Sequence, residues 1–441
     1  MTDSIPRLFL AALTEHADVR SMTLALAAAL GRSGYQPQIY RTVSFVEASD
    51  CMRPLFGLAT RHLDPWILSP QRCRELFART ATLVDIALIE TCGGYHDPTT
   101  LWGLAIALEC PVVGVAHAEE LLDGGVCLKL PPPGILQGVL VDGLDRDDLA
   151  QFQELVPRRC CSPMLGGIDA ACLKPDGTHP ESSRHIRNLA TLLSDSFLEL
   201  SDIEQIVAIA SSRPFPFGES PPELPQPLRR PRVAVAWDDA FRRYLPDALD
   251  ELEAAGAEVI DFAPAACETL PQDVDAIWIG AGELTGDYLR RFADNVCIQS
   301  ALRSHACRGK PIYAEGAGAA LLCQEVRLED GTIWPMTGII PATLLQQEPA
   351  AELLRTEFRP SHACWVLDPE CTYRGYRSRQ WRFDEVDETH VVVRCERTSE
   401  PLIVRRKNCL ASVVHLNFAA CPEAVRRALR PLQDDATTVL D

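Results

Sequence analysis

The strongest candidate for chemistry is a strand-to-helix junction in the second half of the chain. Residues 310–322 read as a strand, a sharp turn and an alanine-rich helix, the architecture of a nucleophile elbow. At such an elbow a reactive side chain stands at a helix N-terminus, where backbone N–H groups can form an oxyanion hole. The elbow position is Gly316, which has no side chain. Cys323 lies about two helical turns further on, roughly 10 Å away, and cannot replace it.

A histidine near the C-terminus is the second candidate. His415 lies between apolar neighbours in the strand-like segment 408–418. Two interpretations stay open at this point: a core histidine with satisfied hydrogen bonds, or a catalytic base.

The first strand-to-helix junction, residues 11–23, lies where a phosphate-binding loop would lie. Such a loop needs glycines, a lysine and a Ser/Thr, in the pattern Gly-x-x-x-x-Gly-Lys-Ser/Thr. The junction has no glycine and no lysine, and Glu15 and Asp18 place negative charge there. One interpretation is an ordinary turn in which Thr14 or Asp18 caps the helix. The other is phosphate binding through three side chains at the start of the helix: Arg20, Ser21 and Thr23.

The junction at residues 85–97 carries two carboxylates. Glu90 ends a buried strand, and Asp97 follows two glycines. This pattern indicates a magnesium or acid/base site, but a hydrogen-bonded Glu90 and a helix-capping Asp97 explain it equally well.

A basic cluster without interleaved acids falls on four arginines, at positions 374, 377, 379 and 382. A solvated strand or loop face is one interpretation. The other is a carboxylate-binding patch centred on Arg377 and Arg379, because guanidinium groups match carboxylates bidentately.

Alternating strand and helix patterns surround these junctions and predict two α/β units with mainly parallel sheets. In the first half the predicted strands are 8–13, 83–89, 111–116 and 137–141, with helices at 22–30 and 99–108. In the second half the predicted strands are 232–236, 258–262, 276–279 and 311–314, with helices at 244–255 and 289–303. Seven prolines between Arg213 and Arg232 forbid helix interior and central strand. We therefore predict domains at 1–212 and 232–441, joined by a linker at 213–231.

Composition narrows the class of protein. The 441 residues exceed a single small module, and 61 acidic against 42 basic residues give a net charge of -19. Such a charge disfavours nucleic acid and anionic lipid as partners. No apolar run is long enough for a membrane helix, and residues 8–13 are too short for the apolar core of a signal peptide. The 17 cysteines include no CxxC pair, so we expect reduced thiols, no metal site and a cytoplasmic location.

Together these segments resemble the cobyrinic acid a,c-diamide synthase family, ATP-dependent glutamine amidotransferases that amidate tetrapyrrole acetate side chains. The resemblance runs along nearly the whole chain. It rests on five motifs in particular: Leu63-Asp-Pro-Trp-Ile-Leu68, Pro111-Val-Val-Gly-Val115, Ile277-Trp-Ile-Gly-Ala-Gly282, Tyr313-Ala-Glu315 and Asn408–Phe418. The last is specific, since the family has Asn-x-Leu-Ala-Ser-x-x-His-Leu-x-Phe there.

The resemblance implies a dethiobiotin-synthetase-like ATPase domain followed by a class I glutaminase-like α/β domain. It also implies that His415 matches the histidine that activates the glutaminase cysteine. Glu90 and Asp97 match acidic positions near nucleotide and magnesium. Three departures are informative: the family's Gly-Lys-Thr loop is missing, its cysteine is Gly316, and its Gly-His-Glu-Phe-His stretch falls on Gly375–Arg379.

We therefore expect a catalytically degenerate member, a pseudoenzyme, that binds MgATP, the family's cofactor, weakly or not at all. It would keep a ligand- or partner-binding role in tetrapyrrole or cobalamin-type metabolism. The alternative is active ATP-dependent amidation of a tetrapyrrole with ammonia or glutamine, which the retained Glu90, Asp97 and His415 favour. The partners we expect are a tetrapyrrole-like polycarboxylate or an intact paralogue, with a homodimer as a further option.

Overall fold

The computed structural model describes residues 5–45, 55–172, 183–215, 229–266, 269–348 and 353–434. The chain divides into two compact units, one built mainly from residues up to 222 and the other mainly from residue 223 onwards. Most of the proline-rich segment 213–231 lies outside the described residues. None of the described helices is both long and apolar enough to cross a membrane.

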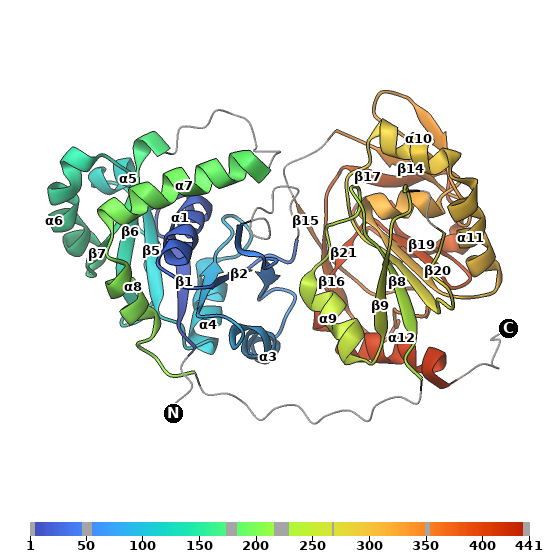
Figure 1. Cartoon of the computed structure of the whole chain (residues 1–441), viewed down its shortest axis with the longest axis horizontal. Helices are drawn as coiled ribbons and strands as arrows, with labels where there is room; N and C mark the ends of the chain where they lie inside the picture. The colour runs from blue at the N-terminus through green and yellow to red at the C-terminus, as the bar shows by residue number, and fades with distance from the viewer. Residues whose placement is uncertain are drawn as a thin grey trace. The chain divides into compact units, whose positions relative to one another are not determined.

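The first unit is a seven-stranded sheet with all its strands parallel, in the order β3-β2-β4-β1-β5-β6-β7 (Figure 1). Its strands are β1 (Arg7–Ala12), β2 (Pro37–Arg41), β3 (Arg61–His62), β4 (Ile86–Glu90), β5 (Val112–His117), β6 (Leu136–Leu144) and β7 (Met164–Asp169). Its helices are α1 (Val19–Arg32), α3 (Pro70–Ala81), α4 (Pro98–Ala107), α5 (Ala118–Leu122), α6 (Leu149–Cys160), α7 (Ser183–Leu200) and α8 (Ile203–Ala210), with 3-10 turns η1 (Arg146–Asp148) and η2 (Ala170–Cys172).

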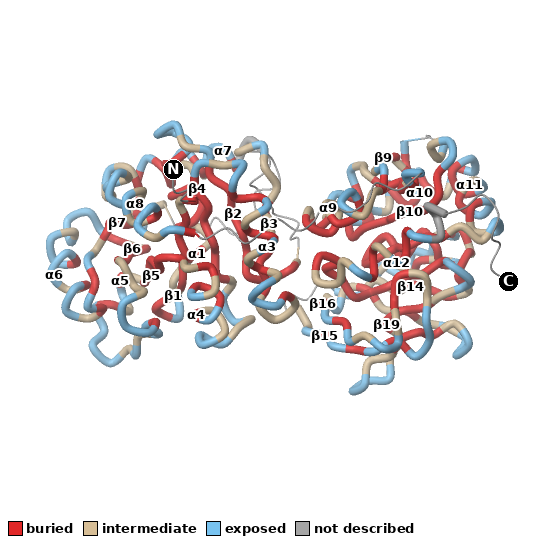
Figure 2. The backbone as a smooth tube through the Cα atoms, turned by 90° about the horizontal axis from the view of Figure 1, so that it is seen from below, coloured by how far each residue is buried: buried red, intermediate tan, exposed pale blue. Residues whose placement is uncertain are grey.

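Alternating strand residues bury the two faces of this sheet against different helices. Leu140 of β6 packs in one cluster with α1, α7 and α8, whereas its neighbours Val139 and Val141 pack with α5 and α6. Likewise Ile39 of β2 lies in the α1 cluster, and the ring of Tyr40 packs 5.2 Å from that of Phe77 in α3. The strands are accordingly buried along their length (Figure 2). The near-continuous apolar character of the predicted strands has this origin.

Chain exit from the first unit is fixed by a buried arginine. Arg7, with 0% exposure, donates to the carbonyl oxygens of Arg213 and Pro214 at 3.0 Å, and its guanidinium lies 5.1 Å from the ring centroid of Phe215. The guanidinium of Arg74 lies 4.8 Å from that centroid. The first three residues of the predicted linker therefore pack into the first unit.

The second unit has a seven-stranded sheet in the order β18-β19-β20-β11-β10-β8-β9, parallel from β9 to β20 and antiparallel beyond it. These strands are β8 (Arg232–Ala236), β9 (Glu258–Phe262), β10 (Ala276–Ile279), β11 (Ile312–Glu315), β18 (Val391–Arg394), β19 (Pro401–Arg406) and β20 (Cys409–Ser412). Two smaller sheets hold β12 (Glu325–Arg327), β13 (Ile333–Pro335), β14 (Thr343–Gln346), β15 (Leu354–Phe358), β16 (Tyr373–Arg377), β17 (Trp381–Asp384) and β21 (His415–Leu416).

The helices of the second unit are α9 (Pro246–Ala254), α10 (Gly286–Asp294), α11 (Val296–Cys307) and α12 (Pro422–Asp434), with 3-10 segments η3 (Gly316–Leu322), η4 (Glu388–His390) and η5 (Phe418–Ala420). The helix predicted at 289–303 is wrong as a single element. Asn295 ends α10, and its side-chain oxygen accepts from the backbone N–H of Ile298, so it caps α11 instead of continuing α10. The small, largely antiparallel sheets were not predicted.

Candidate functional site

The elbow at the end of β11 is present, but it differs in form from the prediction. Gly316 follows Glu315 directly and has φ +56, a left-handed conformation that favours glycine. The segment after it is the 3-10 helix η3 and not an α-helix. Its small residues lie against the end of β10, since a Cβ on Gly318 would approach the carbonyl oxygen of Gly280 to 2.5 Å.

His415 faces the elbow glycine. A Cβ built on Gly316 would lie 2.7 Å from Cε1 and 3.4 Å from Nε2 of the His415 ring. The first distance is shorter than side-chain carbons tolerate, so the His415 ring would have to shift to admit a side chain at position 316. The geometry thus places His415 beside Gly316, as the resemblance implies, whereas a role for His415 as a base stays a prediction.

Glu315 completes this group and was not predicted. Its Oε1 lies 3.7 Å from Nδ1 of His415, and its Oε2 accepts from the hydroxyl of Tyr313 at 2.8 Å. Because Glu315 is the last residue of β11, its side chain is positioned by the same parallel sheet that places Gly316. The carboxylate of Glu315 and the imidazole of His415 thus lie at the elbow, but Gly316 offers no side chain that could act as a nucleophile.

Cys323 does not substitute for the missing nucleophile. It lies at the end of η3, about 14 Å along the axis from Gly316 at the 2.0 Å rise of a 3-10 helix. Its side chain is fully buried, and burial raises the pKa of its thiol far above the usual value. A buried thiol of this kind is unreactive at neutral pH.

The segment Gly375–Arg379 lies beside the histidine, because β16 pairs with β21 and Tyr376 stands opposite His415. Gly375 allows this close approach, since a Cβ there would lie 2.4 Å from the carbonyl oxygen of His415. The strand β16 therefore packs beside His415. It has no histidine at the positions where the family has its Gly-His-Glu-Phe-His stretch.

The four arginines of the predicted basic patch are not brought onto one surface. Arg374 and Arg377 are three positions apart in β16, so they project from opposite faces. Arg374 pairs with Glu357 at 2.5 Å and Arg377 with Glu400 at 3.5 Å. Arg382 lies in a different sheet, and Arg379 is exposed between the two strands. Strand alternation and local acids therefore divide the four arginines, whereas carboxylate binding by Arg377 and Arg379 stays a prediction.

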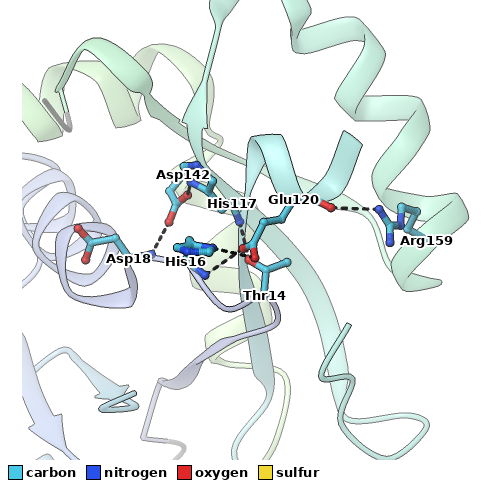
Figure 3. A network of polar contacts seen from close by, with 7 residues as sticks. All are labelled: Thr14, His16, Asp18, His117, Glu120, Asp142 and Arg159. Atoms are coloured by element: carbon cyan, nitrogen blue, oxygen red, sulfur yellow. Dashed lines mark hydrogen bonds and ion pairs between the residues drawn. The ribbon is translucent and has the colours of Figure 1, made fainter. Parts of the chain in front are cut away.

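In the first unit, the junction between β1 and α1 is closed by the protein's own side chains (Figure 3). Asp18 is the N-cap of α1, and its carboxylate accepts from the backbone N–H of Ser21 at 2.9 Å, as one of the two predicted alternatives required. The carboxylate of Asp142, at the carboxyl end of β6, accepts from the backbone N–H of Asp18. Nδ1 of His117, the last residue of β5, lies 2.5 Å from the other oxygen of Asp142.

A second set of hydrogen bonds holds the loop between β1 and α1. The backbone N–H of His16 donates to Glu120 at 2.9 Å, and the ring Nδ1 of His16 lies 3.0 Å from the same carboxylate. Burial alone would raise the pKa of Glu120, but the hydrogen bonds from His16 and Thr14 outweigh it and lower that pKa to about 2. Arg159 of α6 fixes the segment behind it by donating to the carbonyl oxygens of Glu120 and Leu121.

Glu90 and Asp97 both have partners within the protein, whereas a magnesium or acid/base role for them stays a prediction. Glu90, at the end of β4, pairs with Arg41 of β2 at 3.3 Å, and both side chains are at most 5% exposed. Asp97 caps α4 by accepting from the backbone N–H of Thr100 at 3.0 Å, and the hydroxyl of Thr100, the foremost of its partners, lowers its pKa. No group of three His, Cys, Asp or Glu side chains in the described part of the chain is arranged to hold a metal ion.

Sequence reasoning missed Arg41, His117, Asp142 and Glu315. Arg41, His117 and Glu315 each end a strand, and Asp142 lies two residues before the end of β6, at the edge where ligand sites of α/β folds lie. A systematic reading of the residue after each predicted strand would have found His117, Asp142 and Glu315, but not Arg41, because no strand was predicted at β2.

Comparison with known proteins agrees with this architecture. Residues 232–422 match the CobB/CobQ-like glutamine amidotransferase domain. Over 96% of its length the chain is 26% identical to a cobyrinate a,c-diamide synthase from Syntrophotalea carbinolica, of which 98% is covered. The chain is thus similar to cobyrinate a,c-diamide synthases along nearly its whole length, and its second half to the CobB/CobQ-like glutamine amidotransferase domain. The resemblance predicted from the sequence is confirmed.

Other cobyrinate a,c-diamide synthases are similar to the chain to a comparable degree. The cobyrinate a,c-diamide synthase of Dehalococcoides mccartyi is 24% identical over 98% of this chain and 100% of its own. That of Salmonella typhimurium is 28% identical over 85% of this chain and 86% of its own. A solved glutamine amidotransferase is similar over 45% of this chain and 97% of its own, with 20% identity and a TM-score of 0.34.

Proposed function

We propose that this chain is a non-catalytic member of the cobyrinic acid a,c-diamide synthase family. The observation that carries the proposal is the contact between Gly316 and His415. The position of a glutaminase nucleophile has no side chain, and a Cβ built there would lie only 2.7 Å from Cε1 of the His415 ring. Loss of the nucleophile from a comparable triad costs roughly six orders of magnitude in rate. We call this close packing of the His415 ring on Gly316 the closed elbow.

The first unit supports the same conclusion independently. The junction between β1 and α1 does not fit a polyphosphate, because the carboxylates of Asp18 and Asp142 lie at the N-terminus of α1. The junction also has no lysine to offset their charge. Like charges near a phosphate raise its binding free energy, so ATP-driven activation of a carboxylate is disfavoured.

The role we propose is binding without turnover. The relatives are named for cobyrinate, a tetrapyrrole that carries several carboxylates, and the similarity extends over 96% of the chain and not over one domain only. We therefore propose a tetrapyrrole polycarboxylate as the ligand class, with a role in tetrapyrrole or cobalamin-type metabolism. Amidation of such a ligand with ammonia or glutamine is the competing function.

A ligand panel separates these functions. The purified full chain would be titrated with cobyrinic acid, MgATP and glutamine while absorbance and thermal unfolding are followed, with the Salmonella typhimurium synthase as the positive control. A ligand at 100 times its Kd stabilises the folded state by about 2.7 kcal/mol. We expect stabilisation by the tetrapyrrole and none by glutamine or MgATP. Formation of an amidated tetrapyrrole, detected by mass spectrometry, would refute the proposal.

A further inference from the structure

The loop between β1 and α1 is fixed at every second residue. The hydroxyl oxygen of Thr14 accepts from the backbone N–H of His117 at 2.9 Å. His16 is held by Glu120 through its backbone and its ring, and the backbone N–H of Asp18 donates to Asp142. The three partners come from β5, α5 and β6 (Figure 3), and the two strands β5 and β6 follow β1 in the sheet. The loop therefore holds one conformation without help from a ligand.

Asp142 is the buried member of this set. Its side chain has 0% exposure, and burial raises its pKa although the hydrogen bonds from Asp18 and His117 oppose that shift. Burying a carboxylate is costly unless donors compensate it, and here the compensation comes from one backbone N–H next to the helix and one imidazole. Such an arrangement is the one that a bound anion would make with a helix N-terminus.

We propose that Asp142 determines the specificity of the first unit by excluding phosphate anions: its carboxylate takes the place of a ligand beside the N-terminus of α1. The N-terminal end of a helix carries about half a positive charge, and Asp18 and Asp142 already use it. A phosphate would have to displace Asp142 from both of its donors before it could reach that backbone. The missing lysine weakens phosphate binding, and Asp142 prevents it. This inference rests on the proposed loss of ATP-driven chemistry and supplies its cause.

The test uses the full chain and inorganic pyrophosphate with Mg²⁺ as the probe. The variants are D142A, which removes the carboxylate, and D142N, which keeps its shape and one acceptor oxygen. The matched control is D147N, because Asp147 is an exposed acid on η1 close in sequence, so the same net charge is removed. Circular dichroism and thermal unfolding establish that each variant is folded, and D142N serves if D142A does not fold.

Two readouts are measured. Calorimetric titration should give D142A at least a tenfold lower Kd for pyrophosphate than the parent and D147N, with D142N between them. Hydrogen exchange of the loop peptide should be at least tenfold faster in D142A and D142N without pyrophosphate, and slowed again by pyrophosphate in D142A. The inference is overturned if neither Asp142 variant binds pyrophosphate more tightly than the parent, or if D147N gains as much affinity. Turnover of glutamine or ATP by the parent would instead refute the proposed function, so the two failures are distinguishable.

Discussion

Replacing Gly316 by alanine adds one methyl group at the elbow and should be strongly destabilising. Alanine at φ +56 costs about 1–2 kcal/mol relative to glycine. The new Cβ would also lie 2.7 Å from Cε1 of His415, so the ring must move, and such overpacking costs about 1–3 kcal/mol. We expect a total loss of about 2–5 kcal/mol in local stability.

The two contributions can be separated with a double-mutant cycle. In a H415A background the ring is gone, so G316A should cost only about 1–2 kcal/mol for the backbone conformation. The difference measures the contact between the ring and the methyl group.

Hydrogen exchange of peptides from β11 and η3 reports the opening free energy of this segment directly. The matched control is G286A, because a Cβ on Gly286, at the start of α10, meets nothing within 4 Å. It should be neutral. If G316A slows or leaves unchanged the exchange of these peptides, or if its effect is the same with and without the imidazole, the closed elbow described above does not exist.

Further predictions concern the described residues around both sites. Burial lowers the pKa of His305 to about 4, from an ordinary value of 6.5, so the folded protein keeps it neutral while the unfolded chain protonates below pH 6.5. Stability should therefore fall by about 3 kcal/mol between pH 6.5 and 4, and the pH slope of urea unfolding should be smaller in H305Q. Arg7 donates to five carbonyl oxygens, so R7L should lose more than about 3 kcal/mol and melt at a lower temperature. D97A should lose about 1 kcal/mol as a lost helix cap, measured by urea unfolding, and a response to Mg²⁺ that changes with it would contradict this role. The Cys323 thiol should stay unlabelled by iodoacetamide in the native protein, as read by mass spectrometry, because burial raises its pKa.

Much of the fold follows from local pattern. The strands predicted at 232–236 and 276–279 coincide with β8 and β10, because buried parallel strands are largely apolar. The strand predicted at 258–262 coincides with the edge strand β9, in which Glu258 and Asp261 are exposed. The strands between residues 325 and 384 could not be found in this way. Most are three to five residues long and half exposed, so their position depends on partners distant in sequence.

In the candidate sites, too, single residues could be predicted from local sequence, whereas the contacts between them could not. Gly316 and His415 were found from the sequence, since one marks a sharp turn and the other lies in a specific motif. That the ring of His415 contacts the glycine depends on the pairing of β21 with β16 and of β11 with β20. Similarly, Asp18 was found as a possible cap, but its bond to Asp142 joins residues 124 positions apart. Such contacts follow from strand order, which local pattern does not contain.

Glutamine turnover by the parent protein tests the central claim most directly. The full chain, at high concentration with MgATP and a tetrapyrrole present, would be assayed for glutamate released from glutamine, with C323A as the matched variant and the Salmonella typhimurium synthase as the positive control. We predict no glutamate above the uncatalysed rate, because no nucleophile stands at Gly316. Turnover that persists in C323A would contradict this account.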